Sequence, residues 1–332
     1  MKQQAHMSSR TFTVDLVPEQ YKERYLTRGY RQPYSSFLDC LVSLFRLNNE
    51  TLNVWTHLIP LIIIVVYFRQ TFPSEVWPPS NISPYHYPLL AHEMSTMVTL
   101  TGSVIAHTFN CMNPRIRHIC FYVDYTAMAM FFMGGACASF YYMRPLDNVL
   151  FSMPNIYMGL TSMSGIVTVY LCSASRHKWD SSKYLIQTLA FGLTFLTGSF
   201  PSYYRLVSCL ISGQKWTPSM MYLALGSFTY LVAAVLNAIR FPESHHGGTF
   251  DICGHSHQWM HVLTSVGTMF HIIAFESELE TRSDELETLL QGVTFLSTLG
   301  WTLVTLMVAS IVTISFGSNL TVDGHLKNKK QD

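Results

Sequence analysis

The feature that most constrains this chain is a series of long, nearly uncharged apolar stretches. Eight stretches approach or exceed the roughly 20 residues that an α-helix needs to cross a bilayer; they cover about residues 54–72, 88–110, 119–143, 149–172, 185–207, 218–239, 257–275 and 288–317. Only 12% of the residues are charged, against roughly 25% in soluble domains. The sequence therefore predicts an all-α integral membrane protein, a bundle of seven core transmembrane helices followed by an eighth, C-terminal span.

Lysine and arginine predict the orientation, because cytoplasmic segments are enriched in both. Seven of them precede the first span, and three more lie in the C-terminal tail: Lys2, Arg10, Lys22, Arg24, Arg28, Arg31, Arg46, Lys327, Lys329 and Lys330. We therefore expect the N-terminus and the tail to be cytoplasmic. An even number of spans follows, which favours eight over seven and places the acidic loop Glu276–Glu287 outside.

These patterns divide the chain into four parts. We expect a cytoplasmic N-terminal segment (1–33), an amphipathic helix at the membrane interface (34–50), the transmembrane bundle (51–317) and a cytoplasmic tail (318–332). The amphipathic helix is predicted from apolar residues at helical spacing; a soluble helix packed under the bundle is the alternative. The first twenty residues lack an apolar signal-peptide core, so insertion is expected to use a later, uncleaved segment.

Three histidines are predicted to meet at the cytoplasmic end of the bundle. His257 and His261 are four residues apart, so on a helix they share one face. The seventh span enters from the cytoplasm at about His257, and the second span ends there, near His107. Three imidazoles at one depth, with an open fourth position, are the ligand pattern of a catalytic zinc site. The alternative is polar packing in which these side chains satisfy one another.

Two further polar residues are predicted at the same depth. Asp124 begins the third span on its inner side, and Ser103 lies one turn before His107 on the same helix face. A carboxylate beside zinc can hold the bound water or orient a ligand, and a serine hydroxyl can stabilise a developing oxyanion. Asp124 and Ser103 are therefore the candidate catalytic residues if the protein is a hydrolase.

Four other polar residues are expected to lie apart from this group. His255 precedes the span and is expected at the surface, whereas His271 lies too far toward the outer face. Glu93 is expected either to line a pocket that opens outward or to be a buried carboxyl with a hydrogen-bond partner. Asn237 is expected to bond between helices.

The motifs that carry these residues resemble those of the progestin and adipoQ receptor family. The stretch NNETLNVWTHLIP (Asn48–Pro60) is similar to the signature of that family's first span, and Ser103-x-x-x-His107, Asp124-Tyr125 and His257-x-x-x-His261 match its other motifs. NETLNVWTH and the eighth span resemble the membrane progestin receptor branch more than the adiponectin receptor branch. The resemblance implies zinc as the cofactor, bound by His107, His257 and His261.

Two functions follow as expectations from this resemblance. The first is a plasma-membrane receptor for a progestin-like steroid or another apolar ligand, which signals rapidly and has G proteins as suggested partners; a cytoplasmic N-terminus argues against coupling in the manner of rhodopsin-like receptors. The second is a zinc-dependent lipid amidase similar to ceramidases, in which metal-activated water attacks the amide. The sequence shows no basic stripe with interleaved aromatics, so nucleic acid is not expected as a partner.

Overall fold

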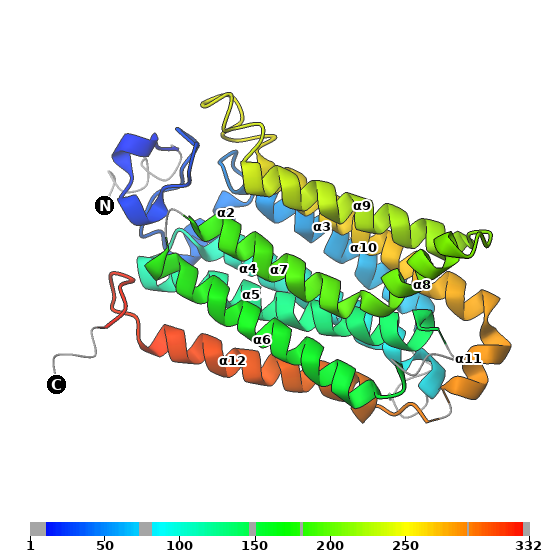
Figure 1. The fold of residues 1–332 in the computed structure, drawn as a ribbon. Coiled ribbons are helices and arrows are strands. Elements are labelled where there is room, and N and C mark those ends of the chain that lie inside the picture. Colours follow the sequence, from blue (N-terminus) through cyan, green and yellow to red (C-terminus); the bar gives the residue numbers. More distant parts are fainter. Residues whose placement is uncertain (1–10, 73–81, 146–150, 180–181, 291, 328–332) are drawn as a thin grey trace.

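The computed structural model describes residues 11–72, 82–145, 151–179, 182–290 and 292–327. This part of the chain is helical, without a strand; its only β pairings are isolated bridges between Phe12 and Tyr30 and between Leu320 and Leu326. Long helices run side by side in one elongated bundle, and the described part of the chain begins and ends at the same end of it (Figure 1).

Each predicted span corresponds to a helix or a helix pair. The structure contains α2 (Phe37–Ser43), α3 (Thr51–Thr71), α4 (Tyr87–Phe109), α5 (Pro114–Ala138), α6 (Pro154–Lys178), α7 (Lys183–Gly198), α8 (Phe200–Ile211), α9 (Pro218–Ile239), α10 (Ser256–Thr281), α11 (Ser283–Leu289) and α12 (Trp301–Ser318). A π-helical turn extends α5 to Met143, and another, Leu296–Gly300, leads into α12.

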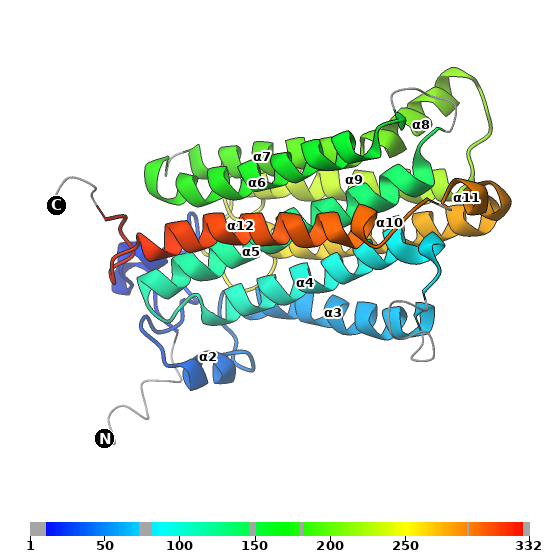
Figure 2. The same cartoon turned by 90° about the horizontal axis from the view of Figure 1, so that it is seen from below.

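Five helices in the described residues are long and apolar enough to cross a membrane by length and composition. They are α3, α5 with its π-helical turn, α6, α9 and α12 with the preceding turn. The predicted spans at 88–110 and 257–275 correspond to α4 and α10, which hold His107, His257 and His261. Figure 2 shows α4, α5 and α10 running through the bundle beside α3 and α12.

Prolines and polar caps begin several of these helices. Pro114, Pro154 and Pro218 stand at the first positions of α5, α6 and α9, where a missing N–H costs no hydrogen bond. The Asn113 side chain accepts from the N–H of Ile116 at the start of α5. Local sequence thus sets where these helices start after each turn.

The predicted span at 185–207 is divided into two helices. Pro201 is the second residue of α8. It has no N–H to donate to the carbonyl of residue 197, and its ring clashes with that carbonyl, so a continuous helix cannot form there. The Tyr157 hydroxyl lies 3.2 Å from the Thr197 carbonyl oxygen and 2.5 Å from that of Gly198. A side chain of α6 therefore satisfies backbone groups that the break leaves without helical partners.

The segment expected as the acidic loop Glu276–Glu287 is mostly helical, which corrects that expectation. It comprises the end of α10 and most of α11, and Glu278 is fully buried between two arginines. Arg282 lies 3.2 Å from its carboxylate, and Arg205 forms a second ion pair with it. Buried charge pairs thus extend the helix where sequence polarity alone predicts a loop.

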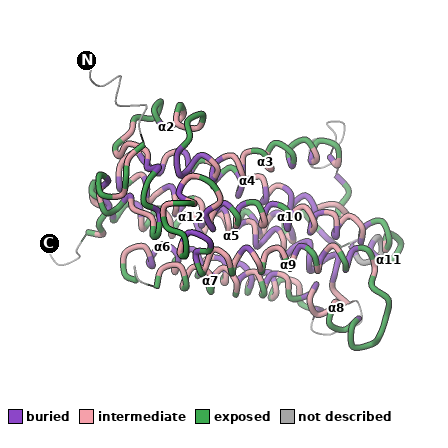
Figure 3. Tube along the Cα trace, turned by 90° about the horizontal axis from the view of Figure 1, so that it is seen from above, coloured by how far each residue is buried: buried purple, intermediate pink, exposed green. Residues whose placement is uncertain are grey.

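The amphipathic segment before the bundle forms a shorter helix than 34–50. Only α2 is helical, capped by a reciprocal pair of hydrogen bonds between Ser36 and Asp39. Its apolar side chains Phe37 and Leu38 are exposed. In Figure 3, exposed residues mark α2 and the outer faces of the bundle, while buried residues lie between the helices. The position of α2 at a membrane interface stays a prediction.

Candidate metal centre and cavity

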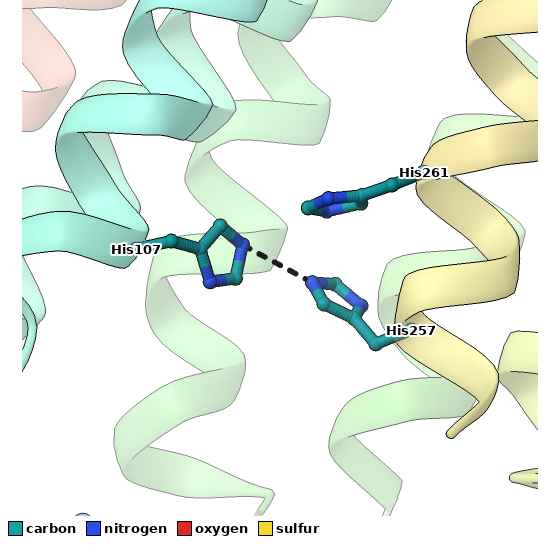
Figure 4. Close-up of side chains that lie close together, drawn as sticks. All are labelled: His107, His257 and His261. Atoms are coloured by element: carbon teal, nitrogen blue, oxygen red, sulfur yellow. Dashed lines mark hydrogen bonds between the residues drawn. The ribbon is translucent and has the colours of Figure 1, made fainter. Parts of the chain in front are cut away.

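Three histidines from two helices converge at the end of the bundle that holds both termini. His107 lies in the last turn of α4, and His257 and His261 lie on one face in the first turns of α10. One ring nitrogen from each lies within 4.8 Å of the others. Figure 4 shows the three rings pointing toward one another across the gap between the helices. The structure therefore brings together the three residues that the sequence placed at one depth.

Each of these imidazoles uses its Nδ1 atom for a bond to an oxygen acceptor. His107 Nδ1 lies 2.7 Å from the Glu50 carboxylate, His261 Nδ1 3.0 Å from the Asn53 carbonyl oxygen, and His257 Nδ1 3.3 Å from the Asn237 amide oxygen. An acceptor at Nδ1 places the proton there. The Nε2 lone pair of each ring is then available for a metal.

The distance between the Nε2 atoms of His107 and His257 suits a shared zinc ion. His107 Nε2 and His257 Nε2 are 3.3 Å apart, and two nitrogens on a tetrahedral zinc with bonds of about 2.0–2.1 Å are separated by about 3.3–3.4 Å. With both Nδ1 atoms protonated, two neutral rings would direct lone pairs at each other. A shared cation turns this repulsion into coordination, so the donor set suits a metal that imidazole binds.

Glu50 is the carboxylate that orients the site, and the sequence analysis did not identify it. It is buried, and its two oxygens accept from Asn53 Nδ2 at 2.7 Å, Asn110 Nδ2 at 2.8 Å and His107 Nδ1. A carboxylate behind a ligating histidine fixes its tautomer and raises its basicity. Its position just before the first predicted span, in the polar run NNETLN, was the available signal.

His57 of α3 and Arg31 of the N-terminal segment pack around this centre. His57 stacks on His261 with ring centroids 3.7 Å apart. Arg31 donates to the carbonyl oxygens of His107 at 2.7 Å and Thr108 at 2.8 Å, which occupies carbonyls at the end of α4. His57 and Glu50, both within the stretch Asn48–Pro60 that resembles the first-span signature, thus pack directly against the histidines.

Ser103 and Asp124 line the same cavity as the three histidines. The cavity has a volume of about 670 Å³ and extends from the histidines between the helices. Much of its remaining wall is apolar and aromatic, including Met128, Phe131, Phe195, Phe228 and Leu231. Ser103 is buried and Asp124 half-buried. The cavity thus joins a polar, histidine-lined wall to an apolar interior.

The prediction for His255 was wrong, and those for His271 and Asn237 are confirmed. His255 is buried, 2% exposed, with Nε2 3.2 Å from the Asn49 carbonyl oxygen, because residues before α3 cover it. His271 lies apart from the three histidines and lines a separate small cavity of about 20 Å³. Asn237 bonds across from α9 to His257 on α10.

Glu93 agrees with neither of its two expected environments. Its side chain is fully buried in α4, and neither carboxylate oxygen has a hydrogen-bond partner among the residues that the structure describes. It does not line the large cavity. Its burial is clear, but the predicted partner is not found in the described part of the chain.

The N-terminal segment covers the cavity at this end of the bundle. Glu23 lines the cavity, pairs with Arg117 of α5, and accepts from the Tyr184 hydroxyl of α7 at 3.1 Å. Burial by itself raises the pKa of Glu23, but the positive charges of Arg117, Lys183 and Arg240 outweigh it and the pKa is lowered. Glu23 is therefore an anionic link between the N-terminal segment and the bundle.

Comparison with known proteins agrees with the motifs. Residues 45–272 match the family described as haemolysin-III related. The chain is 30% identical to membrane progestin receptor gamma-A of Danio rerio over 96% of both chains, and 32% identical to membrane progestin receptor delta of Mus musculus over 81% of this chain and 79% of that protein. It is 34% identical to membrane progestin receptor gamma of Mus musculus over 78% of both chains. The chain thus belongs to the haemolysin-III-related family of multi-pass membrane proteins, which is the progestin and adipoQ receptor family that its motifs resemble.

Proposed function

We propose that this chain is a plasma-membrane receptor for a progestin-like steroid, with a zinc ion held by His107, His257 and His261 near the cytoplasmic face. The observation that carries the proposal is the cavity of about 670 Å³ that begins at these histidines and continues between apolar walls. Ligand pockets commonly measure about 300–1,000 Å³ and combine apolar walls with a few polar groups. The choice of a progestin-like steroid as the ligand follows from the names of the relatives.

The proposed topology has eight spans with both termini in the cytoplasm. Five helices meet the length and composition of spans; α4, α10 and the pair α7–α8 would be the other three. A polar site inside the bundle accounts for the composition of α4 and α10, since polar groups in a membrane face protein rather than lipid. The described part of the chain begins and ends at one end of the bundle (Figure 1), as an even number of crossings requires.

Binding of radiolabelled progesterone to membranes that contain the chain tests the proposal. Ala234 lines the cavity, whereas the neighbouring Val235 is 48% exposed and is not among the lining residues. The substitution Ala234→Phe should obstruct part of the cavity and weaken saturable binding, and Val235→Phe on the same helix should leave it unchanged. An unmodified chain without saturable binding, or equal binding in both variants, would refute the receptor proposal.

A zinc-dependent lipid amidase is the second candidate, favoured by Asp124 and Ser103 on the cavity wall beside the histidines. Zinc bound there would lower the pKa of a coordinated water to about 7 and polarise a carbonyl. Asp124 would accept a proton, and the Ser103 hydroxyl would donate to the substrate oxygen that gains charge.

Ceramide hydrolysis by the purified chain tests this second function. Asp124→Asn should remove activity while the zinc content stays the same, because Asp124 is not one of the three proposed ligands. His261→Ala should remove both. Activity that survives His261→Ala would exclude the mechanism. Signalling through G proteins stays a prediction that a nucleotide-exchange assay with added progestin would test.

A further inference from the structure

Two cysteines meet where α2 packs on the end of α4, and neither proposed function uses them. Cys40 is the one buried residue of α2, and its Sγ atom lies 3.5 Å from that of Cys111, just after the end of α4. Among the described residues, all cysteines are free thiols and no other two of them are in contact. The single side chain that α2 buries is therefore a thiol that faces another thiol.

Contacts on either side of the thiols hold the two segments in place. The Ser35 N–H donates to the Cys111 carbonyl oxygen at 3.3 Å, and the rings of Phe37 and Phe109 stack with centroids 4.9 Å apart. In Figure 2, α2 lies at the edge of the bundle, next to the end of α4. A disulfide needs the sulfurs about 2.05 Å apart. A small rotation of the two side chains would bring the sulfurs from 3.5 Å to that distance.

The surroundings of Cys111 favour its thiolate. Arg31 bonds to the carbonyl oxygen of Thr108 at 2.8 Å and to Asn110 Oδ1 at 2.6 Å, which places its charge beside Cys111. The hydrogen bond from the Cys40 thiol and the charge of Arg31 lower the pKa of Cys111, although burial opposes them. Giving that same bond raises the pKa of Cys40. Since the thiolate is the reactive form, Cys111 is the nucleophile and Cys40 the thiol that follows it.

We propose that Cys40 and Cys111 are a redox modification site, at which hydrogen peroxide forms a reversible disulfide that fastens α2 to the end of α4. The Cys111 thiolate attacks one peroxide oxygen, the O–O bond breaks, and hydroxide leaves a sulfenic acid on Cys111. The Cys40 sulfur then attacks the Cys111 sulfur, and the S–O bond breaks as the departing hydroxide takes the Cys40 proton. The two thiols lose two electrons in total, and the peroxide is reduced to two waters.

The location of the pair suits a transient disulfide. In the proposed topology it lies at the cytoplasmic end, where cellular thiols keep most cysteines reduced and disulfides are mostly transient or redox-sensing. Neither Cys40 nor Cys111 lines the large cavity. The inference therefore goes beyond the proposed function and depends on neither the steroid nor the zinc ion.

Peroxide treatment of the purified full chain in phosphatidylcholine nanodiscs tests the inference. After the peroxide is removed with catalase, the remaining thiols are alkylated and the peptides are mapped by mass spectrometry. A peptide that joins Cys40 to Cys111, with the mass of two hydrogen atoms lost, is the expected product. Dithiothreitol should remove this link completely.

Variants assign the two roles. Cys40→Ser should stop the reaction at a sulfenic acid on Cys111, which dimedone labels. Cys111→Ser should abolish the cross-link and leave Cys40 without label, because Cys40 then has no thiolate beside it. The control is Cys253→Ser, which removes an exposed cysteine and should leave the cross-link unchanged.

Hydrogen exchange tests the fastening of α2. Exchange of the α2 amides should be slower in the oxidised chain than in the reduced chain, and peroxide should not slow it in Cys40→Ser. The inference fails if peroxide leaves Cys40 and Cys111 as thiols in the unmodified chain, even if Cys253 reacts, because the pair would then be a packing contact of two small side chains. A cross-link that leaves α2 exchange unchanged would refute the fastening.

Discussion

Replacement of Glu50 by glutamine should weaken zinc binding without removing a ligand. The substitution keeps the size of the side chain but removes its charge. Glu50 accepts hydrogen bonds from three groups, at 2.7 Å from Asn53 Nδ2, 2.8 Å from Asn110 Nδ2 and 2.7 Å from His107 Nδ1 in the tautomer that leaves Nε2 free. A glutamine has one acceptor oxygen and one donor nitrogen, so at least one of these donors must face another donor.

The size of the effect follows from this geometry. If the glutamine oxygen faces Asn110, its NH₂ group opposes His107 and drives the imidazole toward the tautomer with the proton on Nε2. That tautomer cannot bind a metal through Nε2. If the oxygen faces His107, the tautomer is kept but the charge that raises the basicity of Nε2 is lost. Loss of such a partner typically lowers metal affinity by about 10- to 100-fold, or about 1.4–2.7 kcal/mol.

The assay is a competitive titration of the purified chain with a zinc chelator of known affinity. The matched control is Glu19→Gln, which removes a carboxylate that is exposed and forms a surface pair with Lys22 at 2.8 Å. That variant should bind zinc as the unmodified chain does. A zinc affinity for Glu50→Gln within about twofold of the control would refute the role assigned to Glu50, since the expected loss is at least about tenfold.

Three further predictions concern stability. Glu278→Gln should lower stability by about 3 kcal/mol, because it removes the fully buried counter-charge of the half-buried Arg205; thermal unfolding equal to that of the unmodified chain would contradict this. Tyr157→Phe should cost about 1 kcal/mol, since it removes the donor at the α7–α8 break, and no change would show that the break needs no such donor. The pKa of Glu23 is lowered in the fold, so the stability from its pair with Arg117 should be complete above about pH 4.3 and decline as the pH falls from there through the lowered pKa of the folded state; the pH dependence of unfolding should flatten in Glu23→Gln, and an unchanged slope would contradict this assignment.

The positions of the long helices could be predicted from hydropathy. The breaks within a predicted span could not all be predicted in this way. Residues 218–239 were predicted as a span and form α9 with the same bounds. The break after Gly198 was missed although Pro201 signalled it, because apolar residues on both sides continue the hydropathy signal. Hydropathy responds to the solvent around a segment, whereas a break depends on one missing N–H group.

The grouping of the site residues could be predicted in part, because the place of a residue within a spanning helix predicts its depth in the membrane. His107, His257 and His261 meet because their helices end or begin at the same face. Glu50 and His255 were missed or misplaced because their environment comes from contacts between segments distant in the chain, such as the 3.2 Å contact from His255 Nε2 to the Asn49 carbonyl oxygen. No periodicity in a single sequence reports such a contact.

The most direct test of the zinc proposal is metal analysis of the purified chain, unmodified and with His107→Ala. The converging Nε2 atoms predict one zinc ion per chain, with X-ray absorption at the zinc edge showing nitrogen ligands at about 2.0 Å, and loss of stoichiometric zinc in the variant. An unmodified chain that is free of metal, or a His107→Ala variant that keeps its full zinc content, would contradict the site.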